Sequence, residues 1–315
     1  MAEDSRLTSS ATRGLTVVIA VYNSEATLPE LHRRLRAVLP ALASESEIIF
    51  VNDCSRDRSW EVISGLAASA PTVQGINLMR NYGQHNALLC GIRAAHHETI
   101  VTMDDDLQHP PEEIARLLAR LDDGFDVVYG TPEREQSGLL RALASRLTRF
   151  ALRAAVGPEV ANNVSAFRVF RTQLREAFAD YQTPFVSIDV LLTWATSRFA
   201  ATRVPFHARH AGSSNYTFKT LVRHAFDMMT GFSTAPLQLA SLIGFTCTLF
   251  GIAILFYVVG RYFLEGSVPG FPFLASIIAI FSGAQLFALG VMGEYLARMH
   301  FRSMQRPAYV VRATT

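Results

Sequence analysis

Two long stretches without a charged residue constrain the fold of this chain more than any other feature. No Asp, Glu, Lys or Arg occurs between Asp227 and Arg261, and none occurs between Glu265 and Glu294. Each stretch exceeds the roughly 20 apolar residues that a helix needs to span a bilayer. We therefore expect two membrane-spanning helices joined by a short turn. The alternative is a buried helical hairpin of a soluble protein, although soluble core helices seldom stay free of charge for so long.

Positive charges flank the two predicted spans on one side. Lys219 and Arg223 precede the first span, and three arginines follow the second: Arg298, Arg302 and Arg306. The connecting turn has no Lys or Arg, although Arg261 lies at its edge. The positive-inside rule then places both ends of the hairpin, and the large N-terminal region, in the cytoplasm. This predicts a multi-pass protein of the inner (plasma) membrane whose large N-terminal domain is cytoplasmic.

The first two thirds of the chain alternate between short β-branched runs and helical patterns. The predicted strands are 15–21, 47–51, 73–78, 99–103 and 126–129, and the helical patterns are 28–39, 60–67, 87–95 and 114–121. This alternation predicts an α/β domain with a mostly parallel sheet covered on both faces. The turn after the first strand, 22–25, has no glycine, so a glycine-rich dinucleotide cradle is excluded, and a P-loop is also absent.

Three consecutive carboxylates, Asp104, Asp105 and Asp106, directly follow the fourth predicted strand, and Gln108 comes two residues later. Ligands bind open α/β sheets at the carboxyl ends of the strands. Carboxylate oxygens suit Mg²⁺ or Mn²⁺, and such an ion is usually shared with a substrate phosphate. The alternative is a solvated turn that caps the next helix. Asp53, after the second strand, has the same two interpretations, either a nucleoside ligand or a helix cap.

Several motifs in order resemble the family 2 glycosyltransferases with a GT-A (Rossmann-like) fold. Within that family the chain is similar to the polyprenyl-phosphate glycosyltransferases, which include dolichol-phosphate-mannose synthases and bacterial undecaprenyl-phosphate glucosyl and formamido-arabinose transferases. The resemblance covers about residues 15–311. The matching segments are 18–23, 52–57, 80–87, 104–108, 165–168, 209–216 and 293–296. Asn52 and Cys54 depart from the family's Asp and Gly, and Asn215 stands where the family often has Lys.

The resemblance implies a set of site residues. Catalytic roles fall to Asp104, Asp106, Arg168 and Arg209. Nucleotide-binding roles fall to Val21, Tyr22, Asn23, Glu25, Asp53, Arg80, Asp104 and Asp105, although Asp105 occupies the variable middle position of its motif and reads as a spacer. A Mg²⁺ or Mn²⁺ ion would be held by Asp106, with Asp104 and Gln108. The reaction implied is an inverting single displacement.

A polyprenyl phosphate acceptor would need cations beside it rather than a strong base. A phosphate monoester has a second pKa of about 6, so it is already anionic and can attack without being deprotonated. The candidate cations are Arg134, Arg168 and Arg209, because a guanidinium fork suits phosphate oxygens. For each of the three, an ordinary surface salt bridge is the alternative.

The predicted organisation has five parts. They are 1–14, a flexible N-terminus; 15–212, the transferase domain; 213–235, a juxtamembrane amphipathic segment; 236–297, the two transmembrane helices at about 237–262 and 271–297; and 298–315, a cytoplasmic tail. A basic amphipathic helix in 139–153 would lie in the membrane interface against lipids, or would be a core-facing helix with a solvated basic side. Ser276, Gly283 and Gly290 share a face that packs against the first span or supports a homo-oligomer.

The sequence therefore predicts a metal-dependent, membrane-anchored glycosyltransferase that moves a sugar from a nucleotide sugar, expected to be UDP-linked, to a polyprenyl phosphate for cell-envelope glycan or lipid modification. Processive polysaccharide synthases resemble this fold but carry a Gln-x-x-Arg-Trp motif. That interpretation is discounted, because neither tryptophan of this chain, Trp60 or Trp194, follows an arginine. A catalytically inactive membrane scaffold is the alternative from another class, kept open by Asn52 and Cys54. The net charge of +2 gives no reason to expect nucleic-acid binding.

Overall fold

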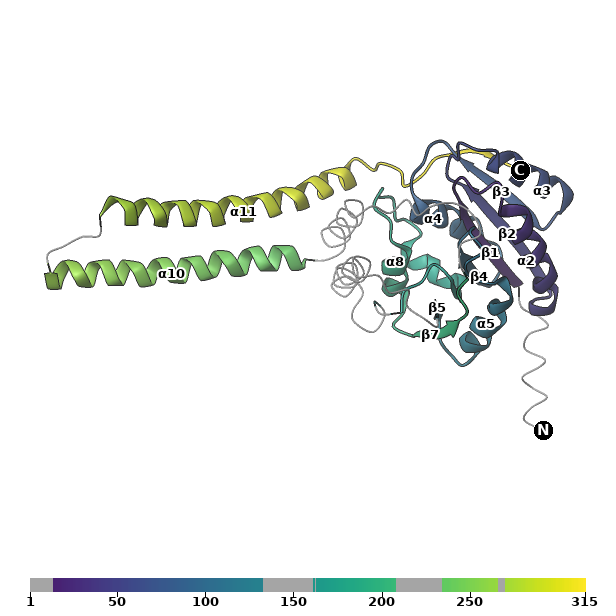
Figure 1. Ribbon diagram of the computed structural model, residues 1–315, viewed down its shortest axis with the longest axis horizontal. Helices are drawn as coiled ribbons and strands as arrows, with labels where there is room; N and C mark the ends of the chain where they lie inside the picture. Colours follow the sequence, from purple (N-terminus) through teal and green to yellow (C-terminus); the bar gives the residue numbers. More distant parts are fainter. Residues whose placement is uncertain (1–13, 133–160, 162, 208–233, 266–269) are drawn as a thin grey trace.

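The computed structural model describes residues 14–132, 161, 163–207, 234–265 and 270–315. They form an α/β domain from which a helical hairpin projects (Figure 1). Eight strands make one sheet: β1 (Gly14–Val21), β2 (Glu45–Asn52), β3 (Val73–Leu78), β4 (Thr99–Met103), β5 (Val127–Pro132), β6 (Arg168–Arg171), β7 (Phe199–Val204) and β8 (Val311–Thr314). The helices are α2 (Leu28–Leu42), α3 (Ser59–Ser69), α4 (Gln84–Ala94), η1 (Pro111–Glu113), α5 (Ile114–Asp122), η2 (Thr172–Phe178), α8 (Ile188–Ala195), α10 (Ala235–Glu265) and α11 (Phe271–Ser303).

The strand order is β7-β5-β6-β4-β1-β2-β3-β8. Strands β1 to β4 pair in parallel, as do β5 and β7, whereas β6 runs antiparallel between β4 and β5 and β8 runs antiparallel to β3. The mostly parallel sheet and its five predicted strands are confirmed. Strands β6, β7 and β8 were not predicted from the sequence.

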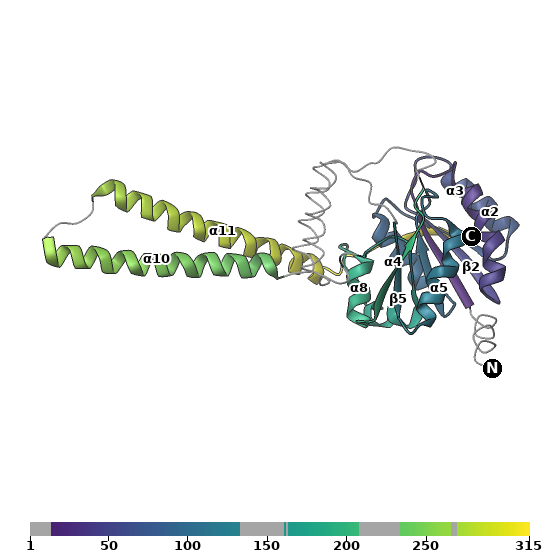
Figure 2. The ribbon, with the colours of Figure 1, turned by 60° about the horizontal axis from the view of Figure 1, so that its bottom comes forward.

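Each face of the sheet carries its own hydrophobic core. Alternate residues of a strand point to opposite faces, so Val17 and Ile19 of β1 pack against α2, α3 and α5, whereas Val18 packs against α4 and α8. Helix α5 presents one apolar stripe, with Ile114 and Leu121 fully buried and charged residues on its other side. The result is a three-layer arrangement in which both faces of the central strands are covered (Figure 2).

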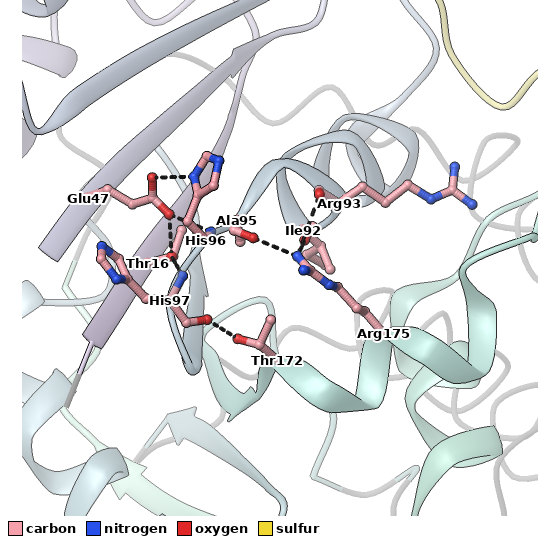
Figure 3. A network of polar contacts seen from close by, with 9 residues as sticks. All are labelled: Thr16, Glu47, Ile92, Arg93, Ala95, His96, His97, Thr172 and Arg175. Atoms are coloured by element: carbon pink, nitrogen blue, oxygen red, sulfur yellow. Dashed lines mark hydrogen bonds and ion pairs between the residues drawn. The ribbon is translucent and has the colours of Figure 1, made fainter.

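A polar network fastens the edge of the sheet where β1 and β2 begin (Figure 3). The Glu47 carboxylate accepts hydrogen bonds from the Thr16 hydroxyl at 2.6 Å and from the His96 backbone N–H at 2.7 Å. Arg175 donates to the carbonyl of Ala95 at 2.6 Å and so satisfies the end of α4. These contacts hold α4 at its C-terminus, and its N-terminus points to the opposite edge of the sheet.

Helices α10 and α11 are long and apolar enough to cross a membrane. The candidate spans are Pro236–Leu264 and Ile280–His300. In each, the most hydrophobic stretch has no residue buried inside the protein. The two helices lie side by side in both views and extend away from the α/β domain (Figures 1 and 2). The two predicted spans therefore coincide with two long apolar helices whose apolar side chains are exposed.

The glycine stripe of α11 does not form the close contact between these two helices. A Cβ atom added at Gly283 or Gly290 would meet nothing within 4 Å. The tight approach is instead at Gly251 of α10, where an added Cβ would lie 2.7 Å from the Phe281 ring. The interpretation that this stripe packs against the first span therefore fails for Gly283 and Gly290.

Candidate active site

The predicted site residues gather where parallel strands β1, β2 and β4 end and where the loop after β3 begins. Polar residues follow the ends of these strands: Asn23 comes two residues after β1, Asp53 directly after β2, and the acidic triplet directly after β4. Ligands of open α/β sheets bind at this carboxyl edge. The three loops are joined by hydrogen bonds between residues far apart in the chain.

Asp104 carries the most perturbed carboxyl group of the triplet. Burial, together with the negative charges of Asp106 and Asp105, raises its pKa to about 7, while the charge of Arg168 and a hydrogen bond from Gln84 oppose the rise. The Gln84 side-chain amide donates to Asp104 Oδ1 at 2.6 Å. Asp104 therefore sits in an acidic environment that a cation would relieve.

Asp106 is buried beside Asp104, and its Oδ1 accepts the backbone N–H of Gln108 at 3.1 Å. Leu107, between Asp106 and Gln108, has a φ of 61°, which turns the chain sharply after Asp106. The Gln108 side-chain amide donates to the carbonyl of His207 at 3.3 Å. Asp106 and Gln108, two of the three predicted metal ligands, thus share a tight turn, and Gln108 is also tied to residue 207.

Asp105 is more than a spacer. Its Oδ2 accepts the Tyr22 backbone N–H at 3.2 Å and the Ser24 hydroxyl at 2.6 Å, so this carboxylate holds the loop after β1. The interpretation of Asp105 as a mere spacer is wrong, because these bonds fix the relative position of two loops. Its predicted contact with a nucleotide stays a prediction.

Asp53 organises the loop between β3 and α4. It is 3% exposed, and its two carboxylate oxygens accept the backbone N–H groups of Tyr82 at 2.7 Å and Gly83 at 2.8 Å. Burial raises its pKa, and these two hydrogen bonds oppose the rise. Gly83 has a φ of 93°, and the next residue, Gln84, begins α4 and reaches Asp104. By holding this loop, Asp53 positions Gln84, which in turn contacts Asp104.

Asn23 and Glu25 link the loops after β1 and β2. Asn23 has a φ of 56°, a conformation that Asn tolerates better than most residues. Its Oδ1 accepts the Arg56 backbone N–H at 2.8 Å, and its own N–H donates to the Ser55 hydroxyl at 3.0 Å. Glu25 accepts the Arg58 backbone N–H at 2.9 Å. Both predicted nucleotide ligands therefore also order the rim of the site.

Arg168 lies at the start of β6 with its side chain 2% exposed and paired with the buried carboxylate of Asp189. The Tyr129 hydroxyl donates to the same Asp189 oxygen at 3.1 Å. A buried guanidinium already paired with a carboxylate does not suit the predicted role as a ligand of the acceptor phosphate. The buried positive charge of Arg168 instead acts on Asp104, whose pKa it lowers against the larger effect of burial.

The remaining predicted residues fall into two groups. Val21 ends β1 with its side chain buried, Tyr22 follows it, and the exposed Arg80 lies over the Tyr82 ring, with the guanidinium carbon 4.6 Å from the centroid. Arg134 and Arg209, like the predicted amphipathic helix in 139–153 and residues 213–233 of the juxtamembrane segment, lie outside the described residues.

Two functional candidates were not assigned by the sequence analysis. Gln84 belongs to the 80–87 signature and stands at the N-terminus of α4, so the signature itself carried the signal for it. Asp189 had no motif, and only the folded chain shows that it meets Arg168 and Tyr129. His109 is also buried, between the rings of Phe167 and Phe206 at 5.3 Å and 5.1 Å, and burial lowers its pKa to about 4.

The donor set fits a hard divalent ion that is completed by a ligand. Among the residues that the structure describes, no group of three or more His, Cys, Asp and Glu side chains is arranged as a complete metal cage. Mg²⁺ is typically held by one or two carboxylates together with substrate phosphates and water. Burial and, after it, the negative charge of Asp106 raise the pKa of Asp104, so a cation bound there would stabilise the ionised carboxylates.

The raised pKa of Asp104 predicts an unusual pH dependence of stability in chelator. In the unfolded chain this carboxyl titrates near 3.8, whereas in the folded protein it titrates near 7. The folded state then binds more protons between these values, so its stability should fall as the pH rises from 5 to 8. Thermal unfolding in EDTA should show this fall, and Asp104→Asn should flatten it. An unchanged slope in Asp104→Asn would contradict the assignment.

Comparison with known proteins agrees with this geometry. Residues 16–178 match the model of the glycosyl transferase family 2. The chain is 36% identical over 301 residues to the undecaprenyl-phosphate 4-deoxy-4-formamido-L-arabinose transferase of Shewanella sediminis, an alignment that covers 94% of this chain and 91% of that protein. It is 35% identical over 308 residues to the protein of the same name from Pseudomonas aeruginosa, covering 95% of this chain and 91% of that protein.

A solved structure shares the fold. The glucosyl-3-phosphoglycerate synthase of Mycobacterium tuberculosis, in complex with Mn²⁺, UDP-glucose and phosphoglyceric acid, superposes with a TM-score of 0.51 at 19% identity, covering 69% of this chain and 78% of that one. The order of motifs, the acidic edge of the sheet and these comparisons agree with the resemblance found in the sequence. The chain is a glycosyltransferase and belongs to the glycosyl transferase family 2.

Proposed function

We propose that this protein transfers a sugar from a nucleotide sugar to undecaprenyl phosphate, or a polyprenyl phosphate close to it, at the cytoplasmic face of the inner membrane. The observation that carries the proposal is the similarity to undecaprenyl-phosphate formamido-arabinose transferases over 94% of the chain, because it includes the apolar hairpin as well as the catalytic domain. A lipid acceptor would account for the hairpin, because a membrane anchor would hold the catalytic domain next to its lipid substrate. The product would be a lipid-linked sugar for cell-envelope glycan or lipid modification.

The acidic edge of the sheet would bind the donor. Asp106 and Asp104 would hold a Mg²⁺ or Mn²⁺ ion, with Gln108 near enough on the same turn to contribute. Such an ion neutralises the donor diphosphate and stabilises the leaving nucleotide. Asp53 and Asn23 would line the nucleoside side, and the loop that Asp53 holds would position the donor. UDP-glucose and Mn²⁺ bound to the mycobacterial enzyme of the same fold support a uridine nucleotide as the donor.

The acceptor phosphate would attack the sugar without a dedicated general base. A phosphate monoester is largely dianionic near neutral pH, so its oxygen is already a competent nucleophile. What the step requires is charge balance between two anionic groups. We assign the cations that contact the acceptor to Arg134 and Arg209, and Arg168 to a buried charge behind Asp104.

A transfer assay with the full chain tests the proposal. Purified protein in detergent would be mixed with Mn²⁺, undecaprenyl phosphate and a panel of radiolabelled sugar nucleotides that includes UDP-4-deoxy-4-formamido-arabinose, UDP-glucose and GDP-mannose. Label should move into the organic phase with at least one UDP-sugar. No lipid-linked product across the whole panel would overturn the proposed function. Metal-dependent UDP binding without transfer would support the assignment of the donor site and reject undecaprenyl phosphate as the acceptor.

A further inference from the structure

The end of the chain returns from the hairpin and completes the sheet beside the loop of the donor site. After α11 ends at Ser303, the chain runs to β8, which pairs antiparallel with β3 at one edge of the sheet (Figure 1). The Ile76–Thr314 and Asn77–Ala313 pairs are in register, and the register shifts at Leu78. Thr315 closes the pairing, since its N–H donates to Gly75 O at 3.0 Å and its hydroxyl accepts the Gly75 N–H at 2.8 Å.

This pairing extends past β3 onto the first residue of the β3–α4 loop. The Met79 N–H donates to Val310 O at 2.9 Å, and the Arg312 guanidinium donates to Met79 O at 2.9 Å. Both backbone groups of Met79 are thus bonded by the C-terminal segment. Just before β8, Ala308 is 3% exposed in the hydrophobic core, which anchors the segment to the face covered by α4.

The loop that begins at Met79 is the one that shapes the acidic site. Three and four residues on, Tyr82 and Gly83 donate to Asp53, and Gln84 then donates to Asp104. The loop is therefore held at its far end by Asp53 and at its near end by the C-terminal segment. A displacement at Met79 would be passed along a loop of only a few residues to Gln84.

The end of α11 makes a second connection to the same region. The Arg298 guanidinium carbon lies 4.6 Å from the centroid of the Phe185 ring. The neighbouring Pro184 carbonyl accepts the side-chain amide of Asn86 at 3.2 Å, and that amide also donates to Tyr82 O at 2.7 Å. The C-terminal extension therefore contacts the loop before α4 directly, whereas the hairpin reaches the first turn of α4 indirectly, through Phe185 and Pro184.

We propose that residues 308–315 act as a positioning clamp that couples the membrane hairpin to the donor-binding loop 79–84, with Arg312 as its positioning residue. The clamp holds Gln84 against Asp104 and the loop against Asp53, so it sets the affinity for the donor nucleotide rather than for the lipid acceptor. The donor part of this inference rests on the proposed function. The coupling of the C-terminal strand to the loop does not.

The test compares Arg312→Ala with the wild type in the full chain, in detergent or nanodiscs. Amide hydrogen exchange of residues 79–84 should become faster, because the loop has lost a bond to its first carbonyl. The KM for the donor should rise about fivefold, since a charge-assisted hydrogen bond at an exposed position is worth about 1 kcal/mol. The KM for the acceptor should stay unchanged, and the unfolding temperature should fall by no more than about 4 °C. Arg312→Lys should restore part of the donor affinity.

A matched control is Arg203→Ala, which removes an exposed arginine from β7 at the opposite edge of the sheet. It should change neither the exchange of 79–84 nor either KM. A chain ending at Val310, without β8, should show the effects of Arg312→Ala more strongly. Wild-type exchange and wild-type donor KM in Arg312→Ala would overturn the clamp. If the wild type transfers no sugar, the proposed function fails, and the exchange of 79–84 alone still decides whether the clamp exists.

Discussion

Asp106→Asn is expected to lower the rate of sugar transfer by on the order of 10³-fold, as expected when a group that stabilises developing charge is lost. Asparagine keeps the size of the side chain and an oxygen that can accept the Gln108 N–H bond, now 3.1 Å long. It removes the negative charge with which Asp106 would hold a divalent ion. The loss should therefore appear in the chemistry and not in the folding of the loop.

Three measurements separate these effects. Transfer of labelled sugar to undecaprenyl phosphate gives the rate, calorimetry with UDP and Mn²⁺ gives metal-dependent binding, and thermal unfolding reports on the fold. The control is Asp123→Asn, which changes an exposed carboxylate at the end of α5 that pairs with Arg120. It should leave transfer and nucleotide binding as in the wild type. Full activity of Asp106→Asn would reject the assignment of Asp106 to the metal.

The sequence could predict the central part of the fold because its signals are local. Strands β1 to β5 are β-branched runs, α2 and α5 have apolar residues at helical spacing, and the hairpin lacks charge over two long stretches. The strands that it missed have no such pattern. β8 has four residues, all exposed, and it exists only because the edge of β3 is open to it. β6 has four residues that begin and end with arginine, and its partners β4 and β5 are distant in the chain.

The candidate site divides in the same way. The position of the acidic triplet follows from a general rule, because the carboxyl ends of parallel strands meet at one edge. What each polar residue does there could not be predicted, since the partners of Asp105, Asp53 and Asn23 are 29 to 83 residues away. Three of these loops also turn through positive φ at non-glycine residues: Asn23, Cys54 and Leu107.

Cys54 departs from the family motif in a way that strains the backbone but leaves the candidate site intact. It stands where the motif has glycine, and its φ is 57°, in the left-handed region that glycine occupies at no steric cost. A side chain there costs about 1 kcal/mol or more. The backbone still adopts the turn, and Asp53 next to it keeps both hydrogen bonds to the β3–α4 loop. The substitution therefore gives no support to an inactive scaffold.

Arg168→Met is expected to destabilise the protein by about 3–5 kcal/mol, the usual cost of leaving one member of a buried ion pair unpaired. Among the described residues, the Tyr129 hydroxyl, at 3.1 Å, would then be the remaining hydrogen-bond donor to the buried Asp189 carboxylate. The double variant Arg168→Met/Asp189→Asn should recover most of that stability, because the neutral amide still offers Tyr129 an acceptor oxygen. Urea unfolding of these two variants in detergent measures the recovery. The control is Arg198→Met, which removes an exposed arginine 4.0 Å from Asp126 and should cost less than about 1 kcal/mol.

Activity in the double variant then separates packing from electrostatics. The positive charge of Arg168 lowers the pKa of Asp104, against the larger effect of burial, so its removal should raise that pKa further and keep Asp104 protonated at neutral pH. The double variant, in which both members of the buried pair are neutral, should therefore transfer sugar poorly at pH 7. Its activity should rise as the pH rises toward 9. A double variant with wild-type stability and a wild-type pH profile would show that Arg168 serves the fold alone, and Asp104 would then owe its ionisation to the bound cation.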